Sequence, residues 1–266
     1  MDYEIMMNGN VKIGMQAPEF EAMTTMGNIS LNEYKGKWLV LFSHPGDFTP
    51  VCTTEIITFA RANTYFNEKN TCLLGLSVDS NASTLAWLYS IYCMTGIKVP
   101  FPIISDRNGE IARKYGMISN EISNTETVRN VYIIDECGKI RAIMVYPMQV
   151  GRCIPEILRT IDALQVADRN SAATPANWVP GKPLIMPAPT TFDCLIKRNE
   201  EIERNKNGMS WFLGFKEDKC NRSIEENSKR KEIETIEEKK VEEKSEKEEK
   251  RNSKYEIKNK VKRIIR

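Results

Sequence analysis

The feature that most constrains the fold is an alternation of short β-rich runs with longer helical patterns, which begins at Trp38. The first run, residues 38–42, is entirely apolar, as in a central strand buried on both faces. A helix is expected next, because Thr49 suits an N-cap and Pro50 suits the first helical position. Residues 72–78 then predict a second buried strand.

The alternation continues to about residue 166. It predicts helices over residues 81–94 and 109–115 and strands over residues 101–104, 128–134 and 140–146. A tight turn separates the last two strands, and an amphipathic helix over residues 153–166 follows them. Parallel β-α units that end in an antiparallel hairpin and a helix give an α/β fold with a mixed sheet covered on both faces, which is the thioredoxin-like arrangement.

The C-terminal third has a different composition, so we divide the chain at residue 168. Five prolines in residues 169–216 prevent an extension of the sheet, although Trp178 and the run 211–215 need burial. We interpret this segment as a C-terminal dimerisation extension that packs on the body, residues 1–168, or on a neighbouring subunit. Residues 217–266 contain 31 charged residues, which predicts a solvated helix or disorder.

Charge and composition exclude several classes of protein. Residues 1–216 hold 21 basic and 22 acidic residues, so no basic surface for nucleic acid is expected. No apolar run approaches the roughly 18 residues of a membrane span, and residues 1–18 do not resemble a secretory signal, so we expect a cytoplasmic protein without a membrane partner. Seven cysteines without a Cys-x-x-Cys pair, and one histidine, argue against a disulfide framework, a zinc site or another cofactor.

The most informative segment is Ser43-His-Pro-Gly-Asp-Phe-Thr-Pro-Val-Cys52, which connects a strand to a helix. It places Cys52 near the third position of that helix, where unpaired N–H groups and the helix dipole favour a thiolate. The hydroxyl of Thr49 is expected to point at the same sulfur, and two prolines stiffen the loop. The alternative is that Cys52 is a small buried hydrophobic residue, as many free cysteines are.

The spacing Pro45-x-x-x-Thr49-x-x-Cys52 resembles the active-site motif of the peroxiredoxins, specifically the long microbial branch of the peroxiredoxin 6 subfamily. The resemblance covers nearly the whole body and continues through residues 75–79, 100–103, 127–131 and 146–152. It implies reduction of hydrogen peroxide and organic hydroperoxides by a thiol reductant, either a thioredoxin-like protein or a small thiol. It also implies a homo-oligomer in which dimers form a ring, a decamer.

The resemblance assigns a role to each residue of the motif. Cys52 attacks the peroxide and becomes a sulfenic acid, while hydrogen-bond donors stabilise the departing oxygen. Arg129 is expected beside the sulfur, where it keeps the sulfur ionised and donates to the peroxide oxygens. Thr49 holds the peroxide and orients the thiolate, and Pro45 shields the pocket.

Two further residues support this site by resemblance. Arg152 is the second arginine, with an exposed residue at a helix start as the alternative. His44 is placed at the edge of the pocket, where it hydrogen-bonds substrate or the oxidised sulfur, with a purely structural role as the alternative.

The resolution of the sulfenic acid leaves two possibilities. Either Cys220, the cysteine nearest the aromatic segment at residues 211–215, resolves it, or an external thiol does so. The sequence around Cys93 and Cys194 shows no feature that activates a thiol. An alternative function of another class is a redox-sensitive oligomeric holdase or scaffold.

Overall fold

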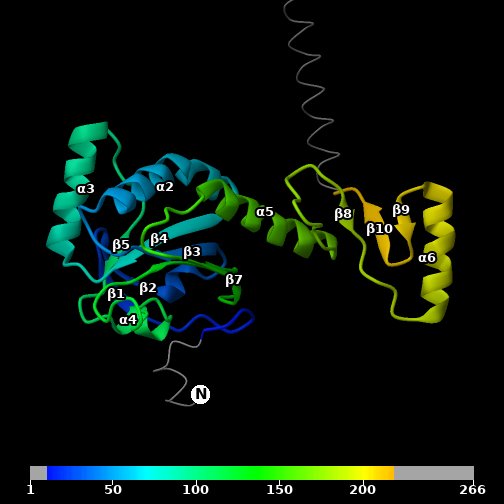
Figure 1. Cartoon of the computed structure of the whole chain (residues 1–266), viewed down its shortest axis with the longest axis horizontal. Helices are drawn as coiled ribbons and strands as arrows, with labels where there is room; N and C mark the ends of the chain where they lie inside the picture. Colours follow the sequence, from blue (N-terminus) through cyan, green and yellow to red (C-terminus); the bar gives the residue numbers. More distant parts are fainter. Residues whose placement is uncertain (1–10, 219–266) are drawn as a thin grey trace, which may run out of the picture. The chain divides into compact units, whose positions relative to one another are not determined.

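The computed structural model describes residues 11–218, and the chain divides into two compact units between Gln165 and Val166. The first unit is built on a seven-stranded sheet with the order β2-β1-β5-β4-β3-β6-β7 (Figure 1). Its strands are β1 (Glu21–Thr24), β2 (Gly27–Ser30), β3 (Trp38–Ser43), β4 (Thr71–Ser77), β5 (Ile103–Ser105), β6 (Arg129–Ile134) and β7 (Ile140–Tyr146). Strands β3, β4 and β5 are parallel, and β6 and β7 continue the sheet antiparallel.

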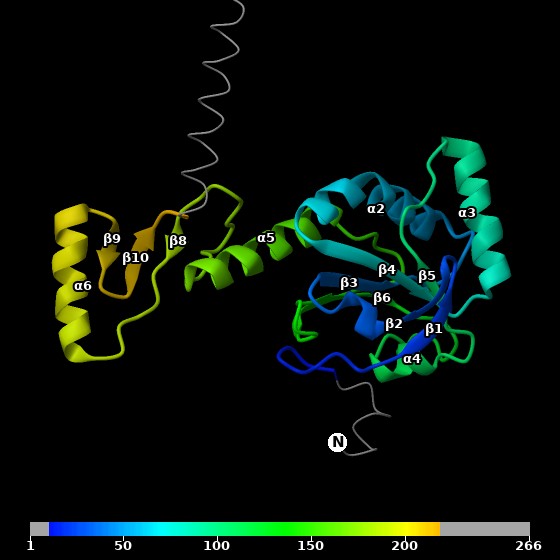
Figure 2. The same ribbon diagram turned by 180° about the vertical axis from the view of Figure 1, so that it is seen from behind.

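Helices cover both faces of this sheet. They are η1 (Leu31–Tyr34), α2 (Pro50–Glu68), α3 (Asn81–Thr95), α4 (Glu110–Lys114) and α5 (Ile154–Asn170). Figures 1 and 2 show α2 and α3 on one side and α4 on the other. Because side chains alternate along a strand, Val40 and Phe42 of β3 join the core beneath α2 and α5, whereas Leu39 and Leu41 join the opposite core.

The predicted mixed α/β sheet with a thioredoxin-like fold is confirmed. The sequence did not predict β1 and β2, and it placed β5 two residues too early. Helix α5 continues to Asn170, beyond the predicted end at residue 166. None of the helices within residues 11–218 is long and apolar enough to cross a membrane.

The second unit has secondary structure of its own. A three-stranded sheet with the order β8-β10-β9 is formed by β8 (Leu184–Ile185), β9 (Gly208–Ser210) and β10 (Leu213–Lys216), and helix α6 spans Phe192–Asn205. The expected burial holds for Trp178 but not for Phe212, which is 60% exposed. Gly214 lies so close to Met186 that a Cβ there would stand 2.5 Å from the Met186 Cε. Within the described residues, this segment forms a small sheet of its own and adds no strand to the seven-stranded sheet.

Candidate functional site

Cys52 lies where the sequence predicts it, in the first turn of α2. Thr49 is the N-cap with an extended backbone, and Pro50 opens the helix. The cysteine is the third helical residue and is fully buried, with 0% of its surface exposed. Its sulfur therefore lies near the unpaired N–H groups of the helix start, where a negative charge is favoured.

Arg129, the first residue of β6, brings its guanidinium to this sulfur. Its Nη1 donates to Cys52 Sγ at 3.3 Å and to Glu55 Oε2 at 2.8 Å. Its Nε and Nη2 both donate to the carbonyl oxygen of Met148, at 2.9 and 2.7 Å. The planar guanidinium is thus held along two edges, and the arginine is 2% exposed.

Glu55 is a site residue to which the sequence analysis gave no role. It lies one helical turn after Cys52 and accepts hydrogen bonds from the side chains of both Arg129 and Arg152. Burial by itself raises the pKa of this carboxyl, but the hydrogen bonds and charge of Arg152, with the charge of Arg129, lower the pKa below its ordinary value. The available signal was the i, i+3 spacing from Cys52, which places both side chains on one helix face.

Arg152 is buried at 6% exposure, so the alternative of an exposed residue is wrong. Its Nε and Nη2 donate to the two carboxylate oxygens of Glu55 at 2.9 and 2.6 Å, and its backbone N–H donates to Oε1 at 2.8 Å. Its Nη1 donates to the carbonyl oxygens of Ser43 and Asn130, at 2.9 and 3.0 Å. The guanidinium also lies 5.1 Å from the ring centroid of Phe42.

The hydroxyl of Thr49 does not make the predicted contact with the sulfur. It donates to the carbonyl oxygen of Gly46 at 2.8 Å, which closes the loop between Pro45 and the helix. Because this bond uses the only proton of the hydroxyl, its oxygen can accept a hydrogen bond from a bound molecule but cannot donate one. Pro45 is buried in the loop that precedes the helix.

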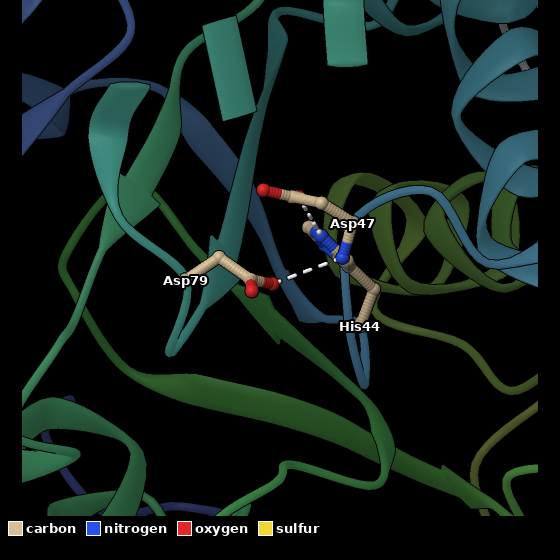
Figure 3. A group of neighbouring side chains, drawn as sticks. All are labelled: His44, Asp47 and Asp79. Atoms are coloured by element: carbon tan, nitrogen blue, oxygen red, sulfur yellow. Dashed lines mark hydrogen bonds and ion pairs between the residues drawn. The ribbon is translucent and has the colours of Figure 1, made fainter. Parts of the chain in front are cut away.

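His44 is fully buried and contacts the loop that holds Cys52. Figure 3 shows it beside Asp47 and Asp79. Its Nε2 lies 3.2 Å from Asp47 Oδ1, Asp47 Oδ2 accepts from the hydroxyl of Thr84, and Asp79 Oδ2 accepts from the Asp47 backbone N–H. Ligand atoms of the three residues lie within 4.8 Å of one another, but three of their carboxylate oxygens already have these hydrogen-bond partners. The three side chains are therefore best explained as holding the loop between β3 and α2 in place.

The other cysteines occupy different environments. Cys72 is half-buried, and burial raises the pKa of its thiol. Four others are exposed: Cys93, Cys137, Cys153 and Cys194. Cys194 lies in the first turn of α6, where its backbone N–H donates to the N-cap hydroxyl of Thr191. This is a helix-start environment that the sequence analysis did not identify. Cys220 lies outside the described residues.

Comparisons with known proteins all match one protein family. A family model described as the AhpC/TSA family matches residues 13–143, and the C-terminal domain of 1-Cys peroxiredoxin matches residues 163–201. Peroxiredoxin 2 of Caldanaerobacter subterraneus is 51% identical over 205 residues, covering 77% of this chain and 92% of the relative.

Solved structures agree with these sequence matches. A variant of peroxiredoxin 6 of Arenicola marina has a TM-score of 0.68 at 32% identity, covering 79% of this chain and 99% of that chain. A yeast mitochondrial 1-Cys peroxiredoxin has a TM-score of 0.66 at 36% identity, covering 78% of this chain and 99% of that chain.

Proposed function

Because the chain belongs to the peroxiredoxins, in the group similar to peroxiredoxin 6, and is a thiol-dependent peroxidase, we propose that Cys52 is its peroxidatic cysteine. The proposed substrates are hydrogen peroxide and organic hydroperoxides. The observation that carries the proposal is the contact of Arg129 Nη1 with Cys52 Sγ at 3.3 Å, at a helix start where both residues are buried.

The charges of the buried cluster support a thiolate at Cys52. Two guanidinium groups, of Arg129 and Arg152, face one carboxylate, that of Glu55, so one positive charge is left beside the sulfur. An uncompensated buried charge is costly, and a thiolate supplies the missing negative charge.

The reaction follows from this arrangement. The thiolate of Cys52 attacks one oxygen of the hydroperoxide, an S–O bond forms and the O–O bond breaks. The sulfur is oxidised to a sulfenic acid, and the departing oxygen leaves as water or alcohol after it gains a proton. Arg129 stabilises the charge that develops on the peroxide oxygens. The acceptor hydroxyl of Thr49 orients the peroxide, and Pro45 excludes water from the pocket.

Three residues, Arg152, Glu55 and His44, hold the site without touching the substrate. Arg152 fixes Glu55, and Glu55 in turn fixes the guanidinium of Arg129. His44 braces the loop through Asp47, and a direct contact with the substrate is no part of the proposal.

We propose that the sulfenic acid is resolved by an external thiol. The match to the C-terminal domain of 1-Cys peroxiredoxin supports this proposal, as does the similar yeast mitochondrial 1-Cys peroxiredoxin, which has a thiol resolving mechanism via glutathione and thioredoxin systems. Cys220 is the competing resolving thiol. In Cys220→Ser, turnover with an external thiol is expected to remain, and loss of that turnover would transfer the role to Cys220.

The proposal includes a cytoplasmic homo-oligomer in which dimers assemble into a ring, a decamer. Helix α3 supports this assembly, because it leaves Leu85, Tyr89 and Tyr92 exposed on one face. Strand β7 supports it as well, because it lies at the edge of the sheet and exposes Val145. Sedimentation velocity of the full chain tests the assembly, and a monomer at micromolar concentration would contradict it.

The central test is the fate of Cys52 after one equivalent of hydrogen peroxide. Peptide mass spectrometry is expected to find oxidised Cys52, and Cys52→Ser is expected to abolish peroxide consumption. Cys137→Ser, at an exposed hairpin position, is the matched control and keeps full activity. If Cys52 remains reduced while peroxide is consumed, the assignment is wrong.

A further inference from the structure

The candidate site occupies a place where the pairing of two central strands stops. Strands β3 and β6 pair antiparallel as far as Phe42 and Val131. Ser43 and Asn130 are the next residues on the two strands, and the site's polar groups bind their backbone there. Nη1 of Arg152 bridges the two carbonyl oxygens of these residues, at 2.9 and 3.0 Å. Side-chain donors therefore bind the backbone here, in the gap that is left where β3 and β6 stop pairing.

The hydroxyl of Ser43 fills the other side of the same gap. Its Oγ donates to the carbonyl oxygen of Val128 at 2.6 Å and accepts from the backbone N–H of Asn130 at 3.1 Å. Both peptide groups that flank Arg129 are thus bound by one side chain. Ser43 is 0% exposed, so water does not substitute for either bond.

The backbone around Arg129 is bent where Ser43 binds it. The N–H of Asn130 also donates to the carbonyl oxygen of Val128 at 3.1 Å, an i to i+2 bond that makes a γ-turn with Arg129 at its centre. On its other edge this backbone pairs with β7 from Arg129 onward, so Ser43 supplies the support on the β3 side of the turn. The direction in which Arg129 leaves the strand, and hence its reach to Cys52, depends on this turn.

We propose that Ser43 is a positioning residue that acts through Arg129: its hydroxyl holds the turn that delivers the guanidinium to the Cys52 sulfur. This inference rests on the proposed function, because Arg129 must act on the peroxide for its position to matter. Ser43 touches neither the sulfur nor the substrate.

The test compares two reactions of the same thiol. One is the rate of a single turnover with hydrogen peroxide, and the other is the rate of alkylation of Cys52 by iodoacetamide, which has no oxygen leaving group for Arg129 to stabilise. Both rates are taken from the plateau of their pH profiles, where the thiol is fully ionised in either variant, so that a change in thiolate content moves neither. Ser43→Ala is expected to slow the peroxide reaction by about ten- to a hundred-fold, the scale of an ångström-sized misplacement, and to change alkylation far less. A purely structural role would move both rates together, and this outcome, or no change in either, overturns the inference.

Two controls make the comparison specific. Thr71→Val removes a buried hydroxyl from the first residue of β4, opposite Trp38 at the far end of β3, and is expected to leave both rates unchanged. Ser43→Thr keeps the hydroxyl and is expected to restore most of the peroxide rate lost in Ser43→Ala.

A double-mutant cycle with Arg129→Lys isolates the coupling and does not depend on whether Ser43→Thr folds. If Ser43 acts through Arg129, Ser43→Ala causes no further loss of the peroxide rate in the Arg129→Lys background. Full additivity of the two losses overturns the inference. If Arg129→Lys alone leaves the peroxide rate unchanged, the role of Arg129 in the proposed function fails. If Arg129→Lys slows the reaction and Ser43→Ala does not, only the role of Ser43 fails.

Discussion

Glu55 binds Arg152 through both carboxylate oxygens, with Oε1 accepting from Nε at 2.9 Å and Oε2 from Nη2 at 2.6 Å, and the backbone N–H of Arg152 completes the pair. The two residues are 97 positions apart in the chain. This pair connects α2, which carries Cys52, to the segment just before α5. Loss of one partner leaves a charge without compensation in the interior.

We expect Glu55→Gln to destabilise the fold by about 3–5 kcal/mol, the usual cost of breaking a buried ion pair by removing one partner. Urea denaturation measures this difference in the free energy of unfolding. Glu156→Gln is the matched control, because Glu156 makes a similar bidentate pair with Arg159 on the surface, where such pairs contribute at most about 1 kcal/mol. Equal losses in the two variants would contradict a buried charge cluster.

The lowered pKa of Glu55 predicts how its contribution depends on pH. A carboxyl whose pKa is lower in the folded state stabilises the fold fully above the unfolded pKa, about 4.3 for glutamate, and this contribution is lost as the pH falls through the lower folded value. The difference in unfolding free energy between the wild type and Glu55→Gln should therefore be constant at neutral pH and shrink in acid. Denaturation curves between neutral pH and pH 3 measure it, and a difference that grows in acid would reverse the assigned sign.

Arg129→Lys should slow the reaction with hydrogen peroxide by about 10²- to 10³-fold, although the charge is kept. A lysine ammonium is a point donor and does not reproduce the fork that contacts Cys52, Glu55 and Met148 together. Stopped-flow competition for peroxide measures the rate. Arg141→Lys on β7 serves as control, since Arg141 pairs with Asp135 in the same sheet away from the sulfur.

Thr49→Ser should retain most of the peroxidase activity, whereas Thr49→Val should lose about 10²-fold or more. The reason is that the hydroxyl donates to the Gly46 carbonyl and so presents its lone pairs as acceptors. Steady-state rates with hydrogen peroxide distinguish the two variants. Equal activity in both would show that the site does not require the hydroxyl.

The sequence predicted those parts of the fold that local patterns encode. Strand β3 is apolar from Trp38 to Phe42, and α2 begins with a proline, so both were predicted within a residue of their observed starts. Strands β1 and β2 were missed because they are four residues long and partly polar. Helix α6 was missed because prolines stand close before it, and prolines are typical of loops. Its own signals are an amphipathic pattern and the N-cap Thr191.

The candidate site was predicted only in part. The helix-start position of Cys52 follows from residues close to it in sequence, whereas the approach of Arg129 was implied by family resemblance alone. Glu55 was missed as a functional residue because its partners lie 74 and 97 positions away, and no local pattern reports such pairs. The hydroxyl direction of Thr49 was predicted wrongly because the hydroxyl donates to a carbonyl three residues earlier in the loop.

Because of the gap where β3 and β6 stop pairing, the proposed activity depends on the complete fold. The gap is filled by the hydroxyl of Ser43 at the end of β3 and by Arg152 from the segment before α5, while Glu55 of α2 and Arg129 of β6 complete the proposed site. No single piece of the chain therefore carries all of it. If α5 and the segment before it detach from the sheet, Arg152 leaves the site and Glu55 loses its support. Peroxide turnover therefore requires the fully folded chain. Under mild denaturant it should fall before circular dichroism reports loss of the sheet.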